Sequence, residues 1–416
     1  MTQKTATLLL FILTSLLCLA GCPAGADAEI EIGAPVGLRA DIPEAAAQPP
    51  VRLLISSVGD VMVHQSQITA QYDNASDTYD FHNNFKYVKK YIEGADLALC
   101  NLETTFGGKP YAGYPLFSAP DALAPALKDT GFDVVITANN HLLDRGVSGL
   151  KGTIEVLRAN GLTPLGSRTS PDEPQYVILD VKGVKIGILA YTYATASSSG
   201  GLLVNGSAIS AAAEGLVNYF RYSHLDDDLA AIKGTADEAR SAGADIIIVY
   251  YHWGEEYQLR SNERQRYIAG KTVADIGADM IFASHPHTPQ EVGFITNSVT
   301  GRQVPVFFSM GNFISNQRTE TLSAPNVRYT EIGVIARVEL DFDIENREIL
   351  SLSAKAVPTW VDKYKAGGRD IYAIIPLDDE MDGNETLAAS GHLSRARKAL
   401  EDARGVLGEM EGAGDL

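Results

Sequence analysis

The chain has 416 residues, of which 45% are hydrophobic, and 34 basic against 52 acidic side chains give a formal net charge of −18. This composition is typical of a globular protein long enough for one large α/β domain with appendages. The acidic balance argues against a nucleic-acid partner, because affinity for phosphates comes mainly from lysine and arginine. It would also repel a polyanionic substrate unless the cleft is basic or metal-loaded. Solubility alone explains the charge equally well.

The first 22 residues have the pattern of a bacterial lipoprotein signal. A short basic start precedes an apolar run over residues 8–19, which is shorter than a membrane-spanning helix requires. The run ends in Leu19-Ala20-Gly21-Cys22, which resembles the lipobox where the signal is cut and Cys22 is lipidated. A plain secretory signal is the alternative. Both predict an extracytoplasmic protein, and the lipobox predicts a lipoprotein anchored to a bacterial membrane through Cys22.

Residues 23–50 are rich in Ala and Pro and predict a disordered tether. From residue 51, short runs rich in Val and Ile predict strands that are covered on both faces. These runs are Val51 to Val58, Leu97 to Cys100, Val134 to Ala138, Val184 to Tyr191, Ile246 to Tyr251, Met280 to Ala283 and Val304 to Phe308. Candidate helices between them include residues 85–92 and 153–158. The alternation predicts an α/β domain with a largely parallel sheet over residues 51–316.

Four Gly-x-Asp triplets precede predicted strands, at residues 94–96, 131–133, 243–245 and 277–279. Glycine suits the left-handed position that ends a helix, after which the chain turns into the next strand. We therefore interpret the triplets as a repeated helix–turn–strand signal and their aspartates as loop residues, not as metal ligands.

The pattern changes after residue 316. Residues 333–342 and 349–357 alternate between apolar and polar and predict an antiparallel pair, and residues 369–376 predict a further strand. Residues 317–390 would thus complete the domain with antiparallel strands. Residues 391–416 predict a helix and a tail, because apolar residues recur at helical intervals over residues 393–410. We expect this helix to pack on the domain, and a partner helix is the alternative.

Polar side chains follow the predicted strands, and in open α/β sheets sites form beyond the carboxyl ends of strands. Four of the eight histidines fall there: His141, His252, His285 and His287. The other polar residues at these positions are Asp60, Asn101, Glu103, Asn140, Asp144, Glu256 and Asn312. Each is a weak signal alone, so the prediction depends on the joint pattern. A mixed nitrogen and oxygen ligand set suits divalent transition metals of the Mn, Fe or Zn class.

The order of these motifs resembles the CapA (PgsA) family of capsule-synthesis proteins. The motifs are Gly59-Asp60-Val61-Met62, Asn101-Leu102-Glu103, Ala138-Asn139-Asn140-His141, His252-Trp253-Gly254, His285-Pro286-His287 and Ser309-Met310-Gly311-Asn312-Phe313. The resemblance covers roughly residues 52–316. It implies the layered α/β fold of calcineurin-like metallophosphatases and a role in poly-γ-glutamate capsule biosynthesis or export. It also implies membrane capsule-synthase subunits as partners.

The metallophosphatase pattern implies a site for two metal ions. Asp60 and His287 would bind the first ion, Glu103 would bridge both, and the second ion would be held by Asn140, His252 and His285. The spacing of His285-Pro286-His287 would place both imidazoles on one face of an extended segment. Asn101, Glu256 and Asn312 would contact the substrate or support the ligands.

His141 would act as general acid, because imidazole is able to donate a proton near neutral pH. Asp144 would orient it, and a helix-start cap is the alternative for Asp144. Two positions depart from the usual pattern. Met62 stands where a histidine is usual, which makes His64 a candidate replacement ligand or a surface residue, and Glu103 stands where the bridging residue is usually aspartate.

We therefore expect a metal-dependent, phosphoesterase-like hydrolase. The alternatives are a non-catalytic accessory subunit of a capsule synthase and a metallophosphatase unrelated to capsule.

Overall fold

The computed structural model describes residues 49–198 and 200–408. The predicted signal, Cys22 and nearly all of the predicted tether lie outside these residues. Within them, none of the helices combines the length and the apolar character needed to cross a membrane.

The first sheet has the strand order β19-β18-β17-β1-β4-β5-β6, and β16 pairs with β1 beside this path. Its strands are β1 (Val51–Val61), β4 (Leu97–Leu102), β5 (Val134–Ile136), β6 (Thr163–Leu165), β16 (Asn312–Ile314), β17 (Ile332–Asp343), β18 (Glu348–Ala366) and β19 (Arg369–Pro376). Strands β1, β4, β5 and β6 run parallel, whereas β17, β18 and β19 continue the sheet antiparallel from the other side of β1. The C-terminal strands therefore belong to the same sheet as β1.

The second sheet has the order β10-β9-β8-β12-β13-β15-β14, with β7 and β11 also paired to β8. Its strands are β7 (Tyr176–Val181), β8 (Val184–Ala196), β9 (Leu202–Val204), β10 (Ser207–Ala208), β11 (Tyr219–Arg221), β12 (Ile246–His252), β13 (Met280–Ser284), β14 (Val292–Thr296) and β15 (Gln303–Phe307). The central strands β8, β12, β13 and β15 are parallel. Strands β2 (Tyr72–Asp73) and β3 (Thr78–Tyr79) form a separate ribbon.

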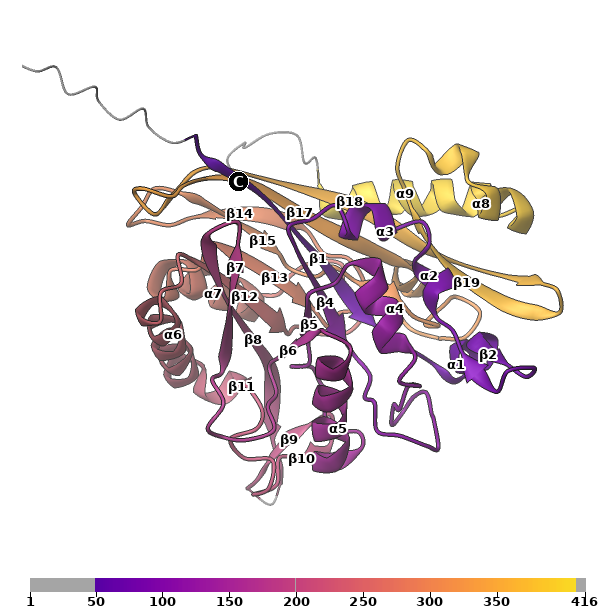
Figure 1. Cartoon of the computed structure of the whole chain (residues 1–416), viewed down its shortest axis with the longest axis horizontal. Coiled ribbons are helices and arrows are strands. Elements are labelled where there is room, and N and C mark those ends of the chain that lie inside the picture. Colours follow the sequence, from indigo (N-terminus) through magenta and orange to yellow (C-terminus); the bar gives the residue numbers. More distant parts are fainter. Residues whose placement is uncertain (1–48, 199, 409–416) are drawn as a thin grey trace, which may run out of the picture. The chain divides into compact units, whose positions relative to one another are not determined.

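Most of the helices lie on the outer sides of the two sheets (Figure 1), whereas the last two pack against the core cluster between the sheets. The first sheet carries α1 (Gln65–Gln71), α2 (His82–Phe85), α3 (Lys89–Ile92), α4 (Leu123–Thr130) and α5 (Gly146–Ala159), and the second carries α6 (Leu225–Ser241) and α7 (Glu263–Lys271). Helices α8 (Glu385–Ser390) and α9 (Leu393–Leu407) follow β19 and contact β18. The predicted helix from residue 393 therefore packs on the domain.

The two sheets bury one core between them. Leu53 of β1 and Leu99 of β4 lie in the same buried cluster as Ile186 of β8 and Ile248 of β12. The outer faces of the sheets pack on the helices in two further clusters. Burial on both faces explains why the central strands read as continuous apolar runs. The expected layered α/β fold, with parallel core strands and C-terminal antiparallel strands, is confirmed.

One expected helix differs. Residues 85–92 form parts of two short helices, α2 and α3. The backbone here makes hydrogen bonds to the third preceding residue, from Val88 N to Phe85 O and from Tyr91 N to Val88 O, which gives a tighter turn than an α-helix. Tertiary contacts hold this arrangement: Asn84 Nδ2 donates to the carbonyl of Tyr372 at 2.7 Å. Such contacts override a local helical pattern.

Candidate metal centre

The carboxyl ends of parallel strands from both sheets meet at one buried site. Asp60 is at the end of β1, Glu103 follows β4, and Asn140 follows β5. His252 ends β12, and His285 and His287 follow β13. All six side chains are buried. The structure thus brings together the six residues to which the resemblance gives metal-ligand roles from separate strands.

Two groups of these residues have ligand atoms close enough to hold a metal ion. Glu103, His285 and His287 form one group, and Asp60, Glu103 and His252 form the other; within each group the ligand atoms lie within 4.8 Å of one another. Glu103 belongs to both groups, which is the position of a bridging carboxylate. The groups pair Asp60 with His252, whereas the resemblance pairs Asp60 with His287.

Glu103 is the member of the site that most needs a cation. Neither of its carboxylate oxygens has a hydrogen-bond partner among the described residues, although the side chain is fully buried. Burial raises the pKa of Glu103 well above its ordinary value, and the nearby charge of Asp60 raises it further. A buried carboxylate without donors is costly unless a positive charge compensates it. The residues present therefore fit a bound metal ion.

Two imidazoles approach the same oxygen of Glu103. The Nε2 atoms of His252 and His287 each lie 3.7 Å from Glu103 Oε1. His252 Nε2 is also 2.9 Å from Asn140 Oδ1. Burial lowers the pKa of His252 to about 3, so its ring is neutral at pH 7 and its nitrogen lone pair is available to a metal.

Asp60 and His287 form a buried pair. His287 Nδ1 lies 3.1 Å from Asp60 Oδ2 and also 3.1 Å from Asn312 Oδ1, so this nitrogen carries the proton that both acceptors share. Burial alone would raise the pKa of Asp60, but the hydrogen bond and charge of His287, the charge of His252 and the hydrogen bond from Asn101 together outweigh burial and hold the pKa well below its usual value. This arrangement leaves His287 Nε2 to face Glu103, as a metal ligand requires.

The segment that carries His285 and His287 is not extended, which corrects the geometry expected from the sequence. Strand β13 ends at Ser284, and both histidines have left-handed backbones, with φ of 102° and 58°. Such values are rare outside glycine and persist only where surrounding structure enforces them. The turn still brings the rings together, with centroids 5.9 Å apart. The buried Nδ1 of His285 has no hydrogen-bond partner within residues 49–198 and 200–408.

Three asparagines hold the ligands in place. Asn101 Nδ2 donates to Asp60 Oδ1 at 2.8 Å, and Asn312 contacts His287 as described above. Sequence reasoning missed Asn139, whose Nδ2 donates to the carbonyl of Leu102 and whose Oδ1 accepts from the backbone of His141. Asn139 thereby fixes the loop after β5 to the end of β4. The position of Asn139 directly before Asn140 and His141 is the feature of the sequence that could have identified it.

His141 belongs to neither metal-binding group, and its partners suit a proton donor. Its Nδ1 lies 2.8 Å from Asp144 Oδ2, and Asp144 also accepts from the backbone of Phe117 at 2.7 Å. The N-cap of α5 is Arg145, so Asp144 is not the cap that was considered as its alternative role. The Phe117 ring stands perpendicular to His141 at 4.7 Å between centroids. No local pattern marked Phe117.

His64 and Glu256 lie at the edge of the site. His64 Nδ1 accepts a hydrogen bond from the backbone of Asn316 at 3.2 Å, and burial lowers the pKa of His64 to about 4. His64 is outside both metal-binding groups, although the charges of His287 and His141 reach it. Glu256 is exposed, and its charge acts on the pKa of both Glu103 and His287.

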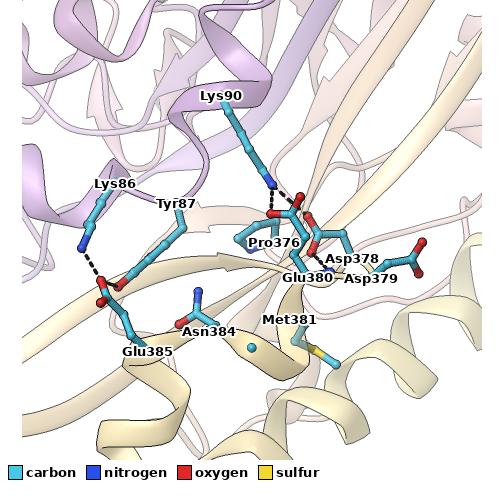
Figure 2. A pocket seen from close by; sticks show the side chains of 11 residues that line it. Lys86, Tyr87, Lys90, Pro376, Asp378, Asp379, Glu380, Met381, Asn384 and Glu385 are labelled. Atoms are coloured by element: carbon cyan, nitrogen blue, oxygen red, sulfur yellow. Dashed lines mark hydrogen bonds and ion pairs between the residues drawn. The ribbon is translucent and has the colours of Figure 1, made fainter.

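A separate cavity of about 690 Å³ contains none of the predicted site residues. It lies between the α2–α3 segment and the chain from β19 to α8, and its lysines reach carboxylates across it (Figure 2). Lys90 Nζ is 2.6 Å from Glu380 Oε2, and Lys86 pairs with Glu385. These ion pairs connect neighbouring elements, so both lysines of the cavity are already paired with carboxylates.

The fold and the site together define a two-sheet α/β protein with a candidate metal centre at its strand ends. Residues 54–317 match the family described as bacterial capsule synthesis protein PGA_cap. The match covers more than half of the chain, and the chain belongs to this family.

Two relatives carry capsule names. The capsule biosynthesis protein CapA of Bacillus anthracis is 28% identical over 295 residues, which are 67% of this chain and 64% of that protein. The PGA biosynthesis protein CapA of Bacillus subtilis (strain 168) is 32% identical over 206 residues, which are 49% of this chain and 48% of that protein. The chain thus spans between about half and two thirds of the length of these relatives.

Two solved structures overlay at a TM-score of 0.39. One is a phosphatase from Mycoplasma pneumoniae, 13% identical, with 74% of this chain and 94% of that chain covered. The other is the calcineurin-like phosphoesterase YfkN from Bacillus subtilis, 16% identical, with 86% and 100% covered. At this TM-score the overlays do not decide the topology, which is given by the strand pairing above.

Proposed function

We propose that this chain is a metal-dependent hydrolase that acts on a phosphoester during assembly of a poly-γ-glutamate capsule. The observation that carries the proposal is the environment of Glu103. Its two buried oxygens have no donors in the part of the chain that the structure describes, while the nitrogens of His252 and His287 and the carboxylate of Asp60 converge on it. Membership of the capsule synthesis family supports the biological context. The name of the Bacillus subtilis relative, a PGA biosynthesis protein, and the motif resemblance support poly-γ-glutamate as the polymer.

The site would hold two divalent ions of the Mn, Fe or Zn class, with Glu103 available to both because it belongs to both ligand groups. When bound, such ions would polarise the ester oxygens and activate water at neutral pH. Asp60, His252, His285 and His287 would hold them, and Asn140 would be the amide ligand. His141 donates a proton to the leaving oxygen from Nε2, because Asp144 occupies its Nδ1.

Substitution of His141 tests the catalytic role. We expect His141→Ala to lower turnover of phenyl phosphate, whose leaving oxygen is basic enough to need a proton, by about 10²- to 10⁴-fold, the usual contribution of a general acid, with metal content nearly unchanged. Exposed His224→Ala is the matched control and should behave like the unaltered chain. The readouts are steady-state kinetics and metal analysis of the same preparations.

Three results would contradict parts of this proposal. A chain that contains no transition metal, and whose thermal midpoint does not change on chelation, would exclude the metal site. Equal loss of metal and turnover in His141→Ala would move His141 into the ligand set. If His141→Ala still restores polymer to cells that depend on the chain, the accessory role replaces the hydrolase.

A further inference from the structure

An exposed aromatic side chain stands beside the proposed proton donor. Tyr114 is 71% exposed and Leu116 is 48% exposed, and both belong to the loop between β4 and α4. Large apolar side chains exposed together often mark a binding surface. This loop is adjacent to the metal centre through Phe117, which contacts His141.

Hydrogen bonds hold this loop in place. Ala112 and Ser118 exchange two backbone bonds, of 3.0 and 2.8 Å, across its base. Phe117 N donates to Asp144, and Phe117 O accepts from Thr105 Oγ1 at 2.7 Å. Tyr114 therefore projects from a fixed support, with its ring edge-on to His141 at 6.5 Å between centroids.

A second tyrosine flanks the ligands from the other sheet. The Tyr257 ring lies 6.2 Å from His287, and its backbone is left-handed, with φ of 63°. That strained conformation is held by bonds from Tyr257 N to Pro286 O and from Asn326 Nδ2 to Tyr257 O. Strain of this kind concentrates at functional sites.

Each tyrosine lies against a histidine of the site, Tyr114 beside His141 and Tyr257 beside His287. Glu256 adds negative charge at this edge, which disfavours a polyanionic group there.

We propose that Tyr114 and Tyr257 form an aromatic clamp that selects phosphoesters whose organic group is uncharged and has a flat apolar face. This inference rests on the proposed function and narrows its substrate class. The ester would be a phosphorylated intermediate, not the polyanionic polymer itself. Tyr114 contacts the organic group on the side where His141 protonates the leaving oxygen, and Tyr257 bounds the opposite side.

Binding of two non-hydrolysable probes tests the clamp without requiring turnover. Phenylphosphonate and methylphosphonate share the metal-binding group and differ in the flat apolar face. We expect the full chain with Mn²⁺ to bind phenylphosphonate about fivefold more tightly by calorimetry, as one aromatic contact provides. Tyr114→Ala should bring the ratio of the two affinities close to one without weakening the binding of methylphosphonate, whereas Tyr114→Phe should keep the fivefold ratio.

Tyr267→Ala is the matched control, because Tyr267 is also exposed, at 44%, but lies on α7. It should leave the ratio unchanged. Equal affinity for the two probes in the unaltered chain, or an unchanged ratio in Tyr114→Ala, would overturn the clamp alone. Failure of both probes to bind in a Mn²⁺-dependent manner would overturn the proposed function and the clamp with it.

Discussion

Glu103 affects both the stability of the fold and the binding of metal. Its carboxylate lies in a buried site, next to Asp60 and without donors among the described residues, and its pKa is raised by burial and by that neighbouring charge. A group whose folded pKa is raised contributes stability that is complete below its unfolded pKa and lost as pH rises. In the metal-free chain, the contribution of Glu103 to the free energy of unfolding therefore falls as pH rises above the ordinary pKa of a glutamate, and a bound cation would reverse this loss.

Glu103→Gln should raise the thermal midpoint of the metal-free chain at pH 7 and abolish the further rise that Mn²⁺ gives the unaltered chain. The gain should shrink as pH falls towards 4.5, because protonated Glu103 no longer carries the charge. Calorimetric scans at pH 5 and pH 7, with and without metal, measure both effects.

Glu331→Gln provides the comparison for Glu103. Glu331 is equally buried, but its carboxylate pairs with Arg318 at 2.9 Å and accepts from the indole of Trp360. Breaking a buried pair costs about 3–5 kcal/mol, and here it should do so regardless of metal. Destabilisation of the metal-free chain by Glu103→Gln would show that Glu103 is an ordinary structural carboxylate.

At the scale of elements, the four Gly-x-Asp triplets have a common structural role. Each aspartate accepts a hydrogen bond from the backbone of the neighbouring strand: Asp96 from Leu54, Asp133 from Ala98, Asp245 from Lys185 and Asp279 from Ile247. The triplets thus connect the starts of adjacent parallel strands. The interpretation of these aspartates as loop residues agrees with these contacts, and the contacts to the neighbouring strand explain the repeat.

Strand β1 pairs in parallel with β16, and two glycines lie where the two backbones come together. A Cβ added at Gly59 would lie 1.9 Å from the carbonyl oxygen of Gly311, which is far below any normal contact. Gly59 directly precedes Asp60, and Gly311 directly precedes Asn312. The close backbone approach therefore sets the positions of both side chains around His287.

Gly59→Ala should cost about 1–3 kcal/mol of stability, the usual penalty for overpacking, and should also reduce metal content by displacing Asp60. Gly234→Ala is the matched control, because a Cβ there meets no atom within 4 Å and Gly234 lies inside α6. It should stabilise the chain by up to about 1 kcal/mol. Denaturant unfolding and metal analysis measure the two effects. Unchanged metal content in Gly59→Ala would contradict the prediction that Gly59 positions Asp60.

At the scale of the whole molecule, the C-terminal third completes the first sheet. Strand β17 pairs along β1 from Val51 to Val58, and Arg318 ties the segment before it to Glu331 and to the carbonyl of Val361 in β18. Because β1 carries Asp60, the C-terminal strands support the metal centre without contributing a ligand. The alternation of apolar and polar residues predicted these strands, but not their pairing with β1.

The membrane anchor remains a proposal about the chain outside the described residues. Cys22→Ala should move the protein from the membrane fraction to the soluble fraction, because a lipidated cysteine would be the attachment. Cys18→Ala is the matched control within the same leader and should leave the protein in the membrane fraction. Immunoblots of fractionated cells measure both, and a Cys22→Ala variant that stays with the membrane would favour another means of attachment.

The sequence by itself determined the strands and the residues at their ends. Runs such as those of β4 and β12 are apolar because both faces are buried, and that requirement is local enough to be visible in the residues. Polar residues directly after such runs, including Asp60, Glu103 and His252, stand out against this background. The same local patterns predicted most of the fold.

Only the tertiary structure decided how those residues are arranged and what surrounds them. The sharing of Glu103 between two ligand groups, the left-handed turn at His285 and His287, and the contact of Phe117 with His141 all depend on the order of strands in two sheets. Loop residues such as Phe117 and Tyr114 carry no periodic signal. Their partners are chosen by chain segments that meet only after both sheets have formed, so no local pattern specifies them.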